Sequence, residues 1–211
     1  PMILALDTST GISVAVLSPQ GELLAARSSA QERSHAEQLA VLIAESLQEA
    51  GVSRAELTAV AVGTGPAPYT GLRVGLVTAT TLGFGLDIPV WGVSSLDALA
   101  ESAPADVTDL VVVTDAKRKE VYTARYRRIA GEWQRISGPD VAKPAALARG
   151  ESIVVGTDVY PELSAQAARV DAAALGRLAI RRAKASLAQP TTPLYLRRPD
   201  ATPPPAPKPP Q

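Results

Sequence analysis

Short apolar runs separated by turn residues open the chain and predict strands. The runs Ile3–Leu6 and Ile12–Leu17 flank the turn TSTG, and Leu23–Arg27 follows a second turn signal, PQG at 19–21. Apolar runs that are bounded by Gly, Pro or Ser in this way are typical of strands. Because both connections are tight turns, the three strands are predicted to form an antiparallel meander.

Helical periodicity follows the meander. The sequence SHAE at Ser34–Glu37 has the S-x-x-E form of a capping box, and Gly51 marks the end of the helix that it starts. The apolar face of this helix is formed by Leu39, Leu42, Ile43 and Leu47. Thr58–Val62 then reads as a strand.

The segment Gly63–Gly85 begins as a loop broken by Gly and Pro and becomes helical near Thr70. Small residues recur there at every fourth position, namely Gly71, Gly75, Ala79 and Gly83. Residues four apart share a helix face, and each Gly inside a helix costs about 0.5–1 kcal/mol relative to Ala. This stripe therefore predicts the close approach of another backbone. Since the other positions are also apolar, we expect one side of the helix to rest on the protein's own sheet and the other on a second subunit.

The rest of the chain predicts further β/α units. Strands are expected at Pro89–Val93, Leu110–Thr114, Val121–Arg128, Glu132–Ser137 and Ile153–Val155, and helices at Ser94–Ser102, Pro161–Arg169 and Asp171–Leu187. A meander that leads into β-α-β units implies a mixed sheet covered by helices. Residues 203–210 are mostly Pro and predict a disordered tail.

Composition narrows the class of protein. The 211 residues can form one large domain or two small lobes with a real core. The absence of Cys excludes disulfides and thiol nucleophiles. The formal net charge is zero, whereas a protein that binds DNA or tRNA by itself usually has a basic excess. No apolar run approaches the roughly 18 residues of a membrane span, and the start PMILALD does not resemble a signal peptide, so a cytoplasmic protein without a membrane partner is expected.

Several short motifs, taken in order, resemble the TsaB family, formerly called YeaZ. The matching segments are LALDTST at Leu4–Thr10, SHAEQL at Ser34–Leu39, GTGPAPYTGLRVG at Gly63–Gly75, VSSLDALA at Val93–Ala100, DAKRKEVY at Asp115–Tyr122 and PLYLR at Pro193–Arg197. Each motif is weak by itself, but together they extend over nearly the whole chain and are specific. The sequence departs from the family at Pro68-Tyr69, where Ser-Phe is usual, and at Lys119, where Gly is common.

The resemblance implies a fold. It is the α/β actin-like ATPase (ASKHA) fold, in which two ribonuclease-H-like lobes contain mixed sheets covered by helices. Residues 1–105 would form the N-terminal lobe with the partner-binding helices, 106–198 the smaller C-terminal lobe, and 199–211 the Pro-rich tail.

The resemblance also implies a role. TsaB proteins are bacterial proteins needed for threonylcarbamoyladenosine in tRNA, and they pair with the related catalytic subunit TsaD and with the ATPase TsaE. TsaD transfers the threonylcarbamoyl group from threonylcarbamoyl-AMP to adenosine 37 of tRNA. We therefore expect a non-catalytic scaffold subunit with no catalytic residues, which reaches tRNA only through the complex.

The expected partner interface is a helix pair, at 35–50 and 70–83, that packs against the matching pair of TsaD as a four-helix bundle. Its residues are His35, Leu39, Leu42, Ile43, Thr70, Gly71, Arg73, Val74, Gly75, Thr78, Ala79 and Leu82. Gly75→Leu or Gly75→Arg is predicted to disrupt assembly while the monomer stays folded. The same face would support a homodimer of the isolated protein.

The first loop has two interpretations. Asp7, Thr8, Ser9 and Thr10 could hold Mg²⁺ and phosphate, as the equivalent loop does in active members of the fold. Alternatively, Asp7 and the hydroxyls satisfy a tight strand turn. We favour the second, a vestigial nucleotide loop, because the fold's second phosphate loop needs Gly and residues 115–120 contain none.

The charged turn within 115–120 also has two interpretations. Lys117, Arg118 and Lys119 could attract phosphate or the tRNA backbone by charge. A solvated hairpin turn explains the same residues equally well.

Two enzyme hypotheses compete with the scaffold hypothesis. An active ATPase or phosphotransferase would bind nucleotide with Mg²⁺ through Asp7 and Thr8. A metalloprotease would need a zinc site, but His35 is the only His and no H-E-x-x-H motif is present. The turn GTGP at 63–66 lacks the Lys-Ser/Thr ending of a Walker A motif. We expect no metal and no intrinsic cofactor, with ATP or ADP and Mg²⁺ bound only in the complex.

Overall fold

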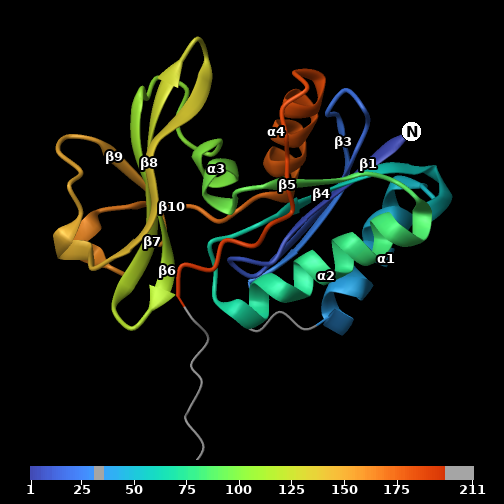
Figure 1. Ribbon diagram of the computed structural model, residues 1–211, viewed down its shortest axis with the longest axis horizontal. Coiled ribbons are helices and arrows are strands. Elements are labelled where there is room, and N and C mark those ends of the chain that lie inside the picture. The colour runs from blue at the N-terminus through green and yellow to red at the C-terminus, as the bar shows by residue number, and fades with distance from the viewer. Residues whose placement is uncertain (31–35, 198–211) are drawn as a thin grey trace, which may run out of the picture.

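Two five-stranded sheets form the framework of the protein (Figure 1). The computed structural model describes residues 1–30 and 36–197. The strand order is β3-β2-β1-β4-β5 in the first sheet and β10-β9-β6-β7-β8 in the second. Helices α1 and α2 lie along one face of the first sheet and α4 lies on its other face, whereas α3 sits between the two sheets.

The first sheet confirms the predicted meander and the β-α-β units that follow it. Its strands are β1 (Met2–Asp7), β2 (Ile12–Leu17), β3 (Leu23–Ser29), β4 (Leu57–Gly63) and β5 (Val90–Val93), and its helices are α1 (Ala36–Ala50) and α2 (Tyr69–Leu86), with the short η1 (Arg54–Glu56) before β4. Strands β1, β2 and β3 pair antiparallel, and β4 pairs parallel with both β1 and β5. The mixed sheet follows directly from the two tight turns and the two helical crossovers.

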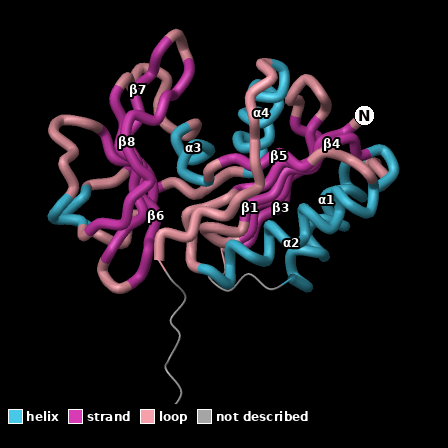
Figure 2. Tube along the Cα trace, viewed as in Figure 1, coloured by secondary structure: helices cyan, strands magenta, loops and turns pink. Residues whose placement is uncertain are grey.

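The second sheet repeats this plan in shorter form (Figure 2). Its strands are β6 (Asp109–Lys117), β7 (Glu120–Ile129), β8 (Glu132–Ala142), β9 (Ile153–Gly156) and β10 (Gln166–Ala167), with the short turns η2 (Pro144–Ala146) and η3 (Pro161–Leu163) between them. Helix α3 (Ser95–Ala100) precedes this sheet in sequence and α4 (Ala172–Lys184) follows it. Strands β6, β7 and β8 form an antiparallel meander, and β9 joins β6 in parallel. Within the described residues, none of the helices is long and apolar enough to cross a membrane.

The prediction of a helix at Pro161–Arg169 is wrong. Only the single turn η3 forms, because Ser164 adopts a left-handed conformation with φ of 48° and ends it. The chain then extends, and Gln166 and Ala167 pair with β9 as strand β10. Pro161 is tolerated at the first position of any helical turn, so its presence gave no information on length.

Helix α4 follows the second sheet in sequence but packs on the first sheet. Its Gly176 permits this contact, since a Cβ there would lie 2.4 Å from Leu17 Cδ1 and 2.9 Å from Ala5 Cβ. Asp171 caps the helix by accepting a hydrogen bond from the Ala173 amide at 3.1 Å. If the chain is divided near residue 105, as expected, α4 belongs to the C-terminal lobe by sequence but packs on the sheet of the N-terminal lobe. The expected tail at 199–211 lies outside the described residues.

Both faces of the central strands β1, β2 and β4 of the first sheet are buried. Leu4 and Leu6 of β1 contact the cluster under α1 and α2, whereas Ile3 and Ala5 face the cluster around α3 and α4. Coverage of both faces explains why the strands read as continuous apolar runs and not as alternating ones.

Candidate functional site

The β1–β2 loop begins at Asp7, whose carboxylate is buried at 1% exposure. Its Oδ1 accepts hydrogen bonds from the Ser9 amide at 2.8 Å and the Ser9 hydroxyl at 2.5 Å. Its Oδ2 accepts the hydroxyl of Ser95, on α3, at 2.6 Å. Both carboxylate oxygens are therefore occupied by groups of the protein itself.

Gly63, at the end of β4, allows the Asp7 carboxylate to lie where it does. A Cβ at Gly63 would lie 1.7 Å from Asp7 Oδ2. Burial raises the pKa of Asp7, and the hydrogen bonds from Ser9 and Ser95 oppose that rise. In this arrangement Asp7 supports the end of β1, and it lines a smaller cavity of about 360 Å³ together with Thr10, Ser13 and Arg169.

The raised pKa of Asp7 gives a prediction on stability and pH. The folded state holds the Asp7 proton more tightly than the unfolded state does, so the contribution of this group to stability falls as the pH rises above the unfolded value. We expect Asp7→Asn to remove this dependence of the free energy of unfolding on pH. Urea denaturation between pH 4 and pH 7 measures it, and wild type should lose stability relative to the variant with rising pH. A difference that is constant over this range would contradict the prediction.

The threonines of the same loop fasten neighbouring elements. The Thr8 hydroxyl donates to the Gly71 carbonyl at 2.6 Å and accepts from the Gly75 amide at 3.1 Å, both in α2. The Thr10 hydroxyl accepts from the Val170 amide at 3.2 Å, just before α4. These two hydroxyls therefore bond to distant segments and not to the turn, within which Ser9 donates to Asp7.

The charged turn joins β6 to β7 as a tight hairpin. Lys117, Arg118 and Lys119 have φ of 61°, 54° and 58°, the left-handed region that favours glycine. Asp115 anchors the hairpin by accepting from the Lys117 amide and the Tyr160 hydroxyl, each at 2.9 Å. The position of the fold's second phosphate loop is therefore filled by long side chains on an unfavourable backbone.

We predict that Lys119→Gly stabilises the protein. A left-handed conformation costs a non-glycine residue roughly 1 kcal/mol, and glycine removes that cost at the price of some unfolded-state entropy. The net gain expected is about 0.5 kcal/mol in the free energy of unfolding. Guanidinium denaturation checks this, with Lys143→Gly, at an exposed residue with ordinary φ, as the control that should not stabilise. A loss of stability at Lys119→Gly would show that the lysine side chain itself holds the turn.

A cavity of about 940 Å³ separates the β1–β2 loop from the β6–β7 hairpin. Polar residues on both walls line it, including Thr8, Ser9, Thr10, Thr114, Asp115 and Lys117. The structure thus brings the two predicted loops to one cleft, at the carboxyl ends of β1 and β6. Asp7 does not line this cavity, and the described residues contain no group of three or more His, Cys, Asp or Glu that could hold a metal ion.

The residues of the predicted partner interface differ in their exposure. Leu39, Ile43, Gly75 and Ala79 are buried, Leu42, Gly71, Val74, Thr78 and Leu82 are half-buried, Thr70 and Arg73 are exposed, and His35 lies outside the described residues. Helices α1 and α2 lie side by side on the first sheet, and of these residues Thr70 and Gly71 line the cavity between the two loops.

The glycine stripe of α2 faces the protein's own sheet. A Cβ at Gly75 would lie 2.6 Å from Thr8 Oγ1, and one at Gly83 would lie 2.3 Å from Val90 Cγ2. The close approach inferred from the stripe is therefore internal, and this geometry leads us to expect that Gly75→Leu or Gly75→Arg destabilises the monomer as well. Periodicity identified the face that needs small residues but not the neighbour that fills it.

Besides Tyr69 at the start of α2, three large, exposed hydrophobic residues of this helix pair were not predicted for the interface. Val77 and Phe84 of α2 are 50% and 92% exposed, and Val41 of α1 is 54% exposed. No charged residue occurs in α2 after Arg73. Val77 and Phe84 are seven positions apart and share one helix face, which was the signal available in the sequence. We call Val41, Val77 and Phe84 the outer apolar surface.

The fold and the cleft define an actin-like two-lobed protein whose first nucleotide loop is engaged in its own hydrogen bonds. The family model "TsaD: tRNA N6-adenosine threonylcarbamoyltransferase" matches residues 22–192. The tRNA threonylcarbamoyladenosine biosynthesis protein TsaB of Escherichia coli is 31% identical over 179 residues, which cover 80% of this chain and 77% of the relative. The chain belongs to the TsaB (YeaZ) family.

Other similar proteins agree with this assignment. YeaZ from Pseudomonas aeruginosa has a TM-score of 0.80 at 30% identity, with 92% of this chain and 99% of that chain covered. An uncharacterized protein of Mycobacterium tuberculosis is 38% identical over 208 residues, which cover 95% of this chain and 94% of that protein. One of Mycobacterium leprae is 36% identical, and the chain spans 56% of its length.

Proposed function

We propose that the protein is a non-catalytic accessory subunit of a complex that synthesises threonylcarbamoyladenosine at adenosine 37 of tRNA. Membership of the TsaB family supports a role in this biosynthesis. The catalytic partner is a TsaD-type subunit, a TsaE-type ATPase joins them, and tRNA is bound through the complex. The observation that carries the proposal is the outward surface of α1 and α2, where Val41, Val77 and Phe84 are exposed and where α2 carries no charged residue after Arg73.

The outward surface suits a helical partner. Val77 and Phe84 are exposed on one face of α2, and half-buried Val74 lies one turn before Val77 in the same helix. Exposed apolar residues gathered on one face mark interaction sites in soluble proteins. The interface proposed here therefore combines the exposed and half-buried members of the predicted set with the outer apolar surface, and the same surface serves a homodimer of the isolated chain.

The occupied β1–β2 loop supports the non-catalytic part of the proposal. An ATPase of this fold would need Asp7 for Mg²⁺ and open amides for phosphate. The cleft of about 940 Å³ is the place where a nucleotide would bind under the alternative hypothesis. Calorimetry of the isolated chain with ATP and Mg²⁺ should give no binding heat. Saturable binding that Asp7→Asn abolishes would favour the independent enzyme.

The β6–β7 hairpin remains a proposed contact for phosphate or tRNA within the complex. Lys117 lines the cleft and is paired with Asp115 at 3.2 Å, and the cationic Arg118 and Lys119 follow it in the hairpin. A contact to the tRNA backbone would weaken with salt. ATP or ADP with Mg²⁺ is proposed to bind only when the partners complete a site.

Reconstitution tests the proposed function. Threonylcarbamoyl-AMP and tRNA would be incubated with the TsaD-type and TsaE-type proteins of the same organism, with and without this chain, and threonylcarbamoyladenosine would be measured by mass spectrometry. We expect product only when this chain is present together with the TsaD-type subunit. Transfer by this chain alone, or equal transfer without it, would overturn the proposal.

A further inference from the structure

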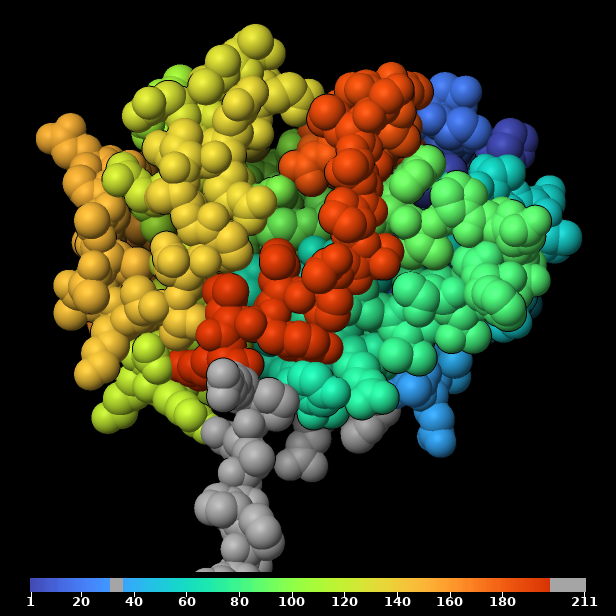
Figure 3. Space-filling view, viewed as in Figure 1, coloured from blue at the N-terminus to red at the C-terminus, as the bar shows by residue number. Residues whose placement is uncertain are grey.

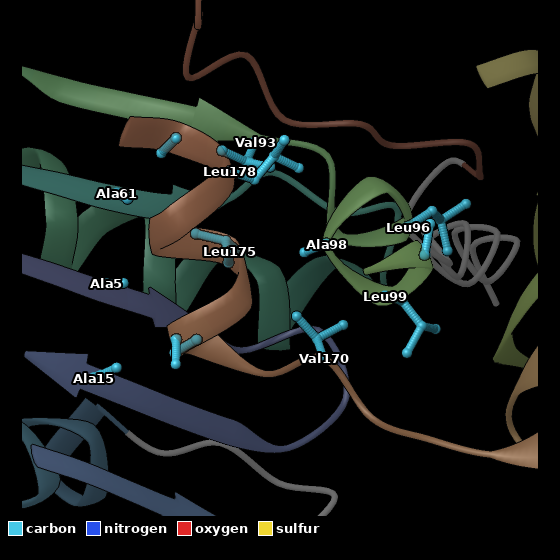
Figure 4. Packing of buried hydrophobic residues seen from close by; sticks show 14 of the residues in the cluster. Ala5, Ala15, Ala61, Val93, Leu96, Ala98, Leu99, Val170, Leu175 and Leu178 are labelled. Carbon is cyan, nitrogen blue, oxygen red and sulfur yellow. The ribbon is translucent and has the colours of Figure 1, made fainter. Parts of the chain in front are cut away.

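Helix α3 lies between the two sheets, and all six of its residues are buried. Leu96 and Leu99 share one hydrophobic cluster with Leu175 of α4 and with Leu110 and Val112 of β6. Figure 4 shows α4, with Leu175 and Leu178, over the strands of the first sheet, and α3 next to it beyond the ends of those strands. The two lobes therefore share a core through α3 and do not merely touch at a linker.

One carboxylate on α3 joins three elements of the molecule. Asp97 Oδ1 accepts the hydroxyl of Tyr126, on β7, at 2.6 Å, and Asp97 Oδ2 accepts an N–H of Arg182, on α4, at 2.9 Å. Arg135 of β8 completes the group with its Nε 3.8 Å from Oδ1. We call Asp97, Tyr126, Arg135 and Arg182 the Asp97 cluster.

The buried charge of Asp97 is stabilised only while Tyr126, Arg135 and Arg182 remain in contact with it. Buried charges require partners, and the Asp97 side chain is 10% exposed. Tyr126 is 2% exposed, and burial together with the neighbouring Asp97 keeps its pKa well above the usual value, so the hydroxyl remains a donor at neutral pH. Separation of the second sheet from α3 would leave the carboxylate without its tyrosine and expose the ring.

Further contacts tie the same elements outside the cluster. Arg181 of α4 bridges Glu101, 2.8 Å away, and Glu132 of β8, 3.1 Å away. The C-terminal segment crosses between the lobes as well, because the Leu194 amide donates to Thr64 at 2.9 Å and Arg197 bonds to Ala116. In Figure 3 this segment covers the junction between the lobes on the visible face.

We propose that α3, α4 and the Asp97 cluster form a latch that holds the two lobes at one fixed angle. Two-domain proteins that bind ligands in a cleft commonly close it by a hinge motion. Here the hinge position is occupied by a buried helix, a buried ion pair and a shared core. The cleft keeps one width, and the protein presents its helix pair to a partner as part of a rigid body.

Interlobe distance measurements test the latch. The chain has no Cys, so Ala44→Cys in α1 and Ala145→Cys in η2, both exposed, permit specific spin labels on the two lobes. Pulsed electron paramagnetic resonance on the full chain should give one narrow distance, unchanged by ATP with Mg²⁺. Asp97→Asn removes the charge at the centre of the cluster and should broaden the distribution about twofold, because the lobes then sample several angles.

A matched substitution controls for the loss of a carboxylate. Asp109→Asn breaks an exposed pair with Arg127, 3.2 Å away, within one sheet, and should leave the distance distribution unchanged. Should Asp97→Asn fail to fold, Tyr126→Phe removes a single hydroxyl and should broaden the distribution to a smaller extent. The labelled chain is diluted with unlabelled chain so that only distances within one molecule are measured. Two such distances in the wild type, a shift on adding ATP with Mg²⁺, or an unchanged distribution in a folded Asp97→Asn or Tyr126→Phe protein would overturn the proposal.

Discussion

Gly75→Leu is expected to destabilise the monomer by about 3 kcal/mol or more, since it overpacks a buried contact and breaks buried hydrogen bonds. Even the first carbon of the new side chain would lie 2.6 Å from Thr8 Oγ1 and 3.4 Å from Leu6 Cδ1. Thr8 would have to give up its bonds to both Gly71 and Gly75. Chemical denaturation followed by circular dichroism measures the loss.

Gly85→Leu is the matched control on the same helix. A Cβ at Gly85 has nothing within 4 Å, and the residue is exposed. Leucine is a better helix former than glycine by about 0.5–1 kcal/mol, so this variant should be at least as stable as wild type. A Gly75→Leu protein of wild-type stability that fails to assemble would mean that the stripe faces a partner and not the sheet.

Val77→Asp is expected to weaken binding of the TsaD-type subunit about 30-fold or more, which corresponds to a hot-spot loss of roughly 2 kcal/mol. Val77 is 50% exposed on the face that the proposal assigns to the interface. An aspartate there would place a charge in the apolar centre of a helix–helix contact, where it finds no partner. Isothermal titration calorimetry with the purified subunit gives the change in Kd.

The control for this prediction is Val159→Asp. Val159 is 60% exposed but lies in the loop after β9, in the other lobe. The Val159→Asp protein should bind the TsaD-type subunit with unchanged affinity. Val77→Asp and Val159→Asp should both keep the stability of the wild type, because neither valine is buried. Equal affinities of wild type and Val77→Asp would remove α2 from the interface.

Local signals were sufficient to predict most of the elements from the sequence. The meander follows from two turns, and α2 follows from its stripe of small residues. The placement of α4 was not predictable, because it depends on the fit of Gly176 to Ala5 and Leu17, which are more than 150 residues away in sequence. The expected helix after Pro161 was wrong for a local reason, the left-handed Ser164.

The sequence identified the two loops of the candidate site but not the contacts that their side chains make. The sequence placed Asp7 and the charged turn on equivalent loops of two lobes, and the structure brings those loops to one cleft. The partner of Asp7 is Ser95, 88 residues further on, and no spacing rule relates the two. Exposure of Phe84 and Val77 likewise depends on which face of α2 the sheet covers.

Light scattering of the chain mixed with the TsaD-type subunit of its organism tests the central claim most directly. At micromolar concentrations we expect a complex with the summed mass of the two proteins, which disappears when Phe84→Asp replaces the wild type while that variant remains folded. Two separate masses in the wild-type mixture, or a complex that Phe84→Asp and Val77→Asp both leave intact, would contradict the account of an accessory subunit that docks through α1 and α2.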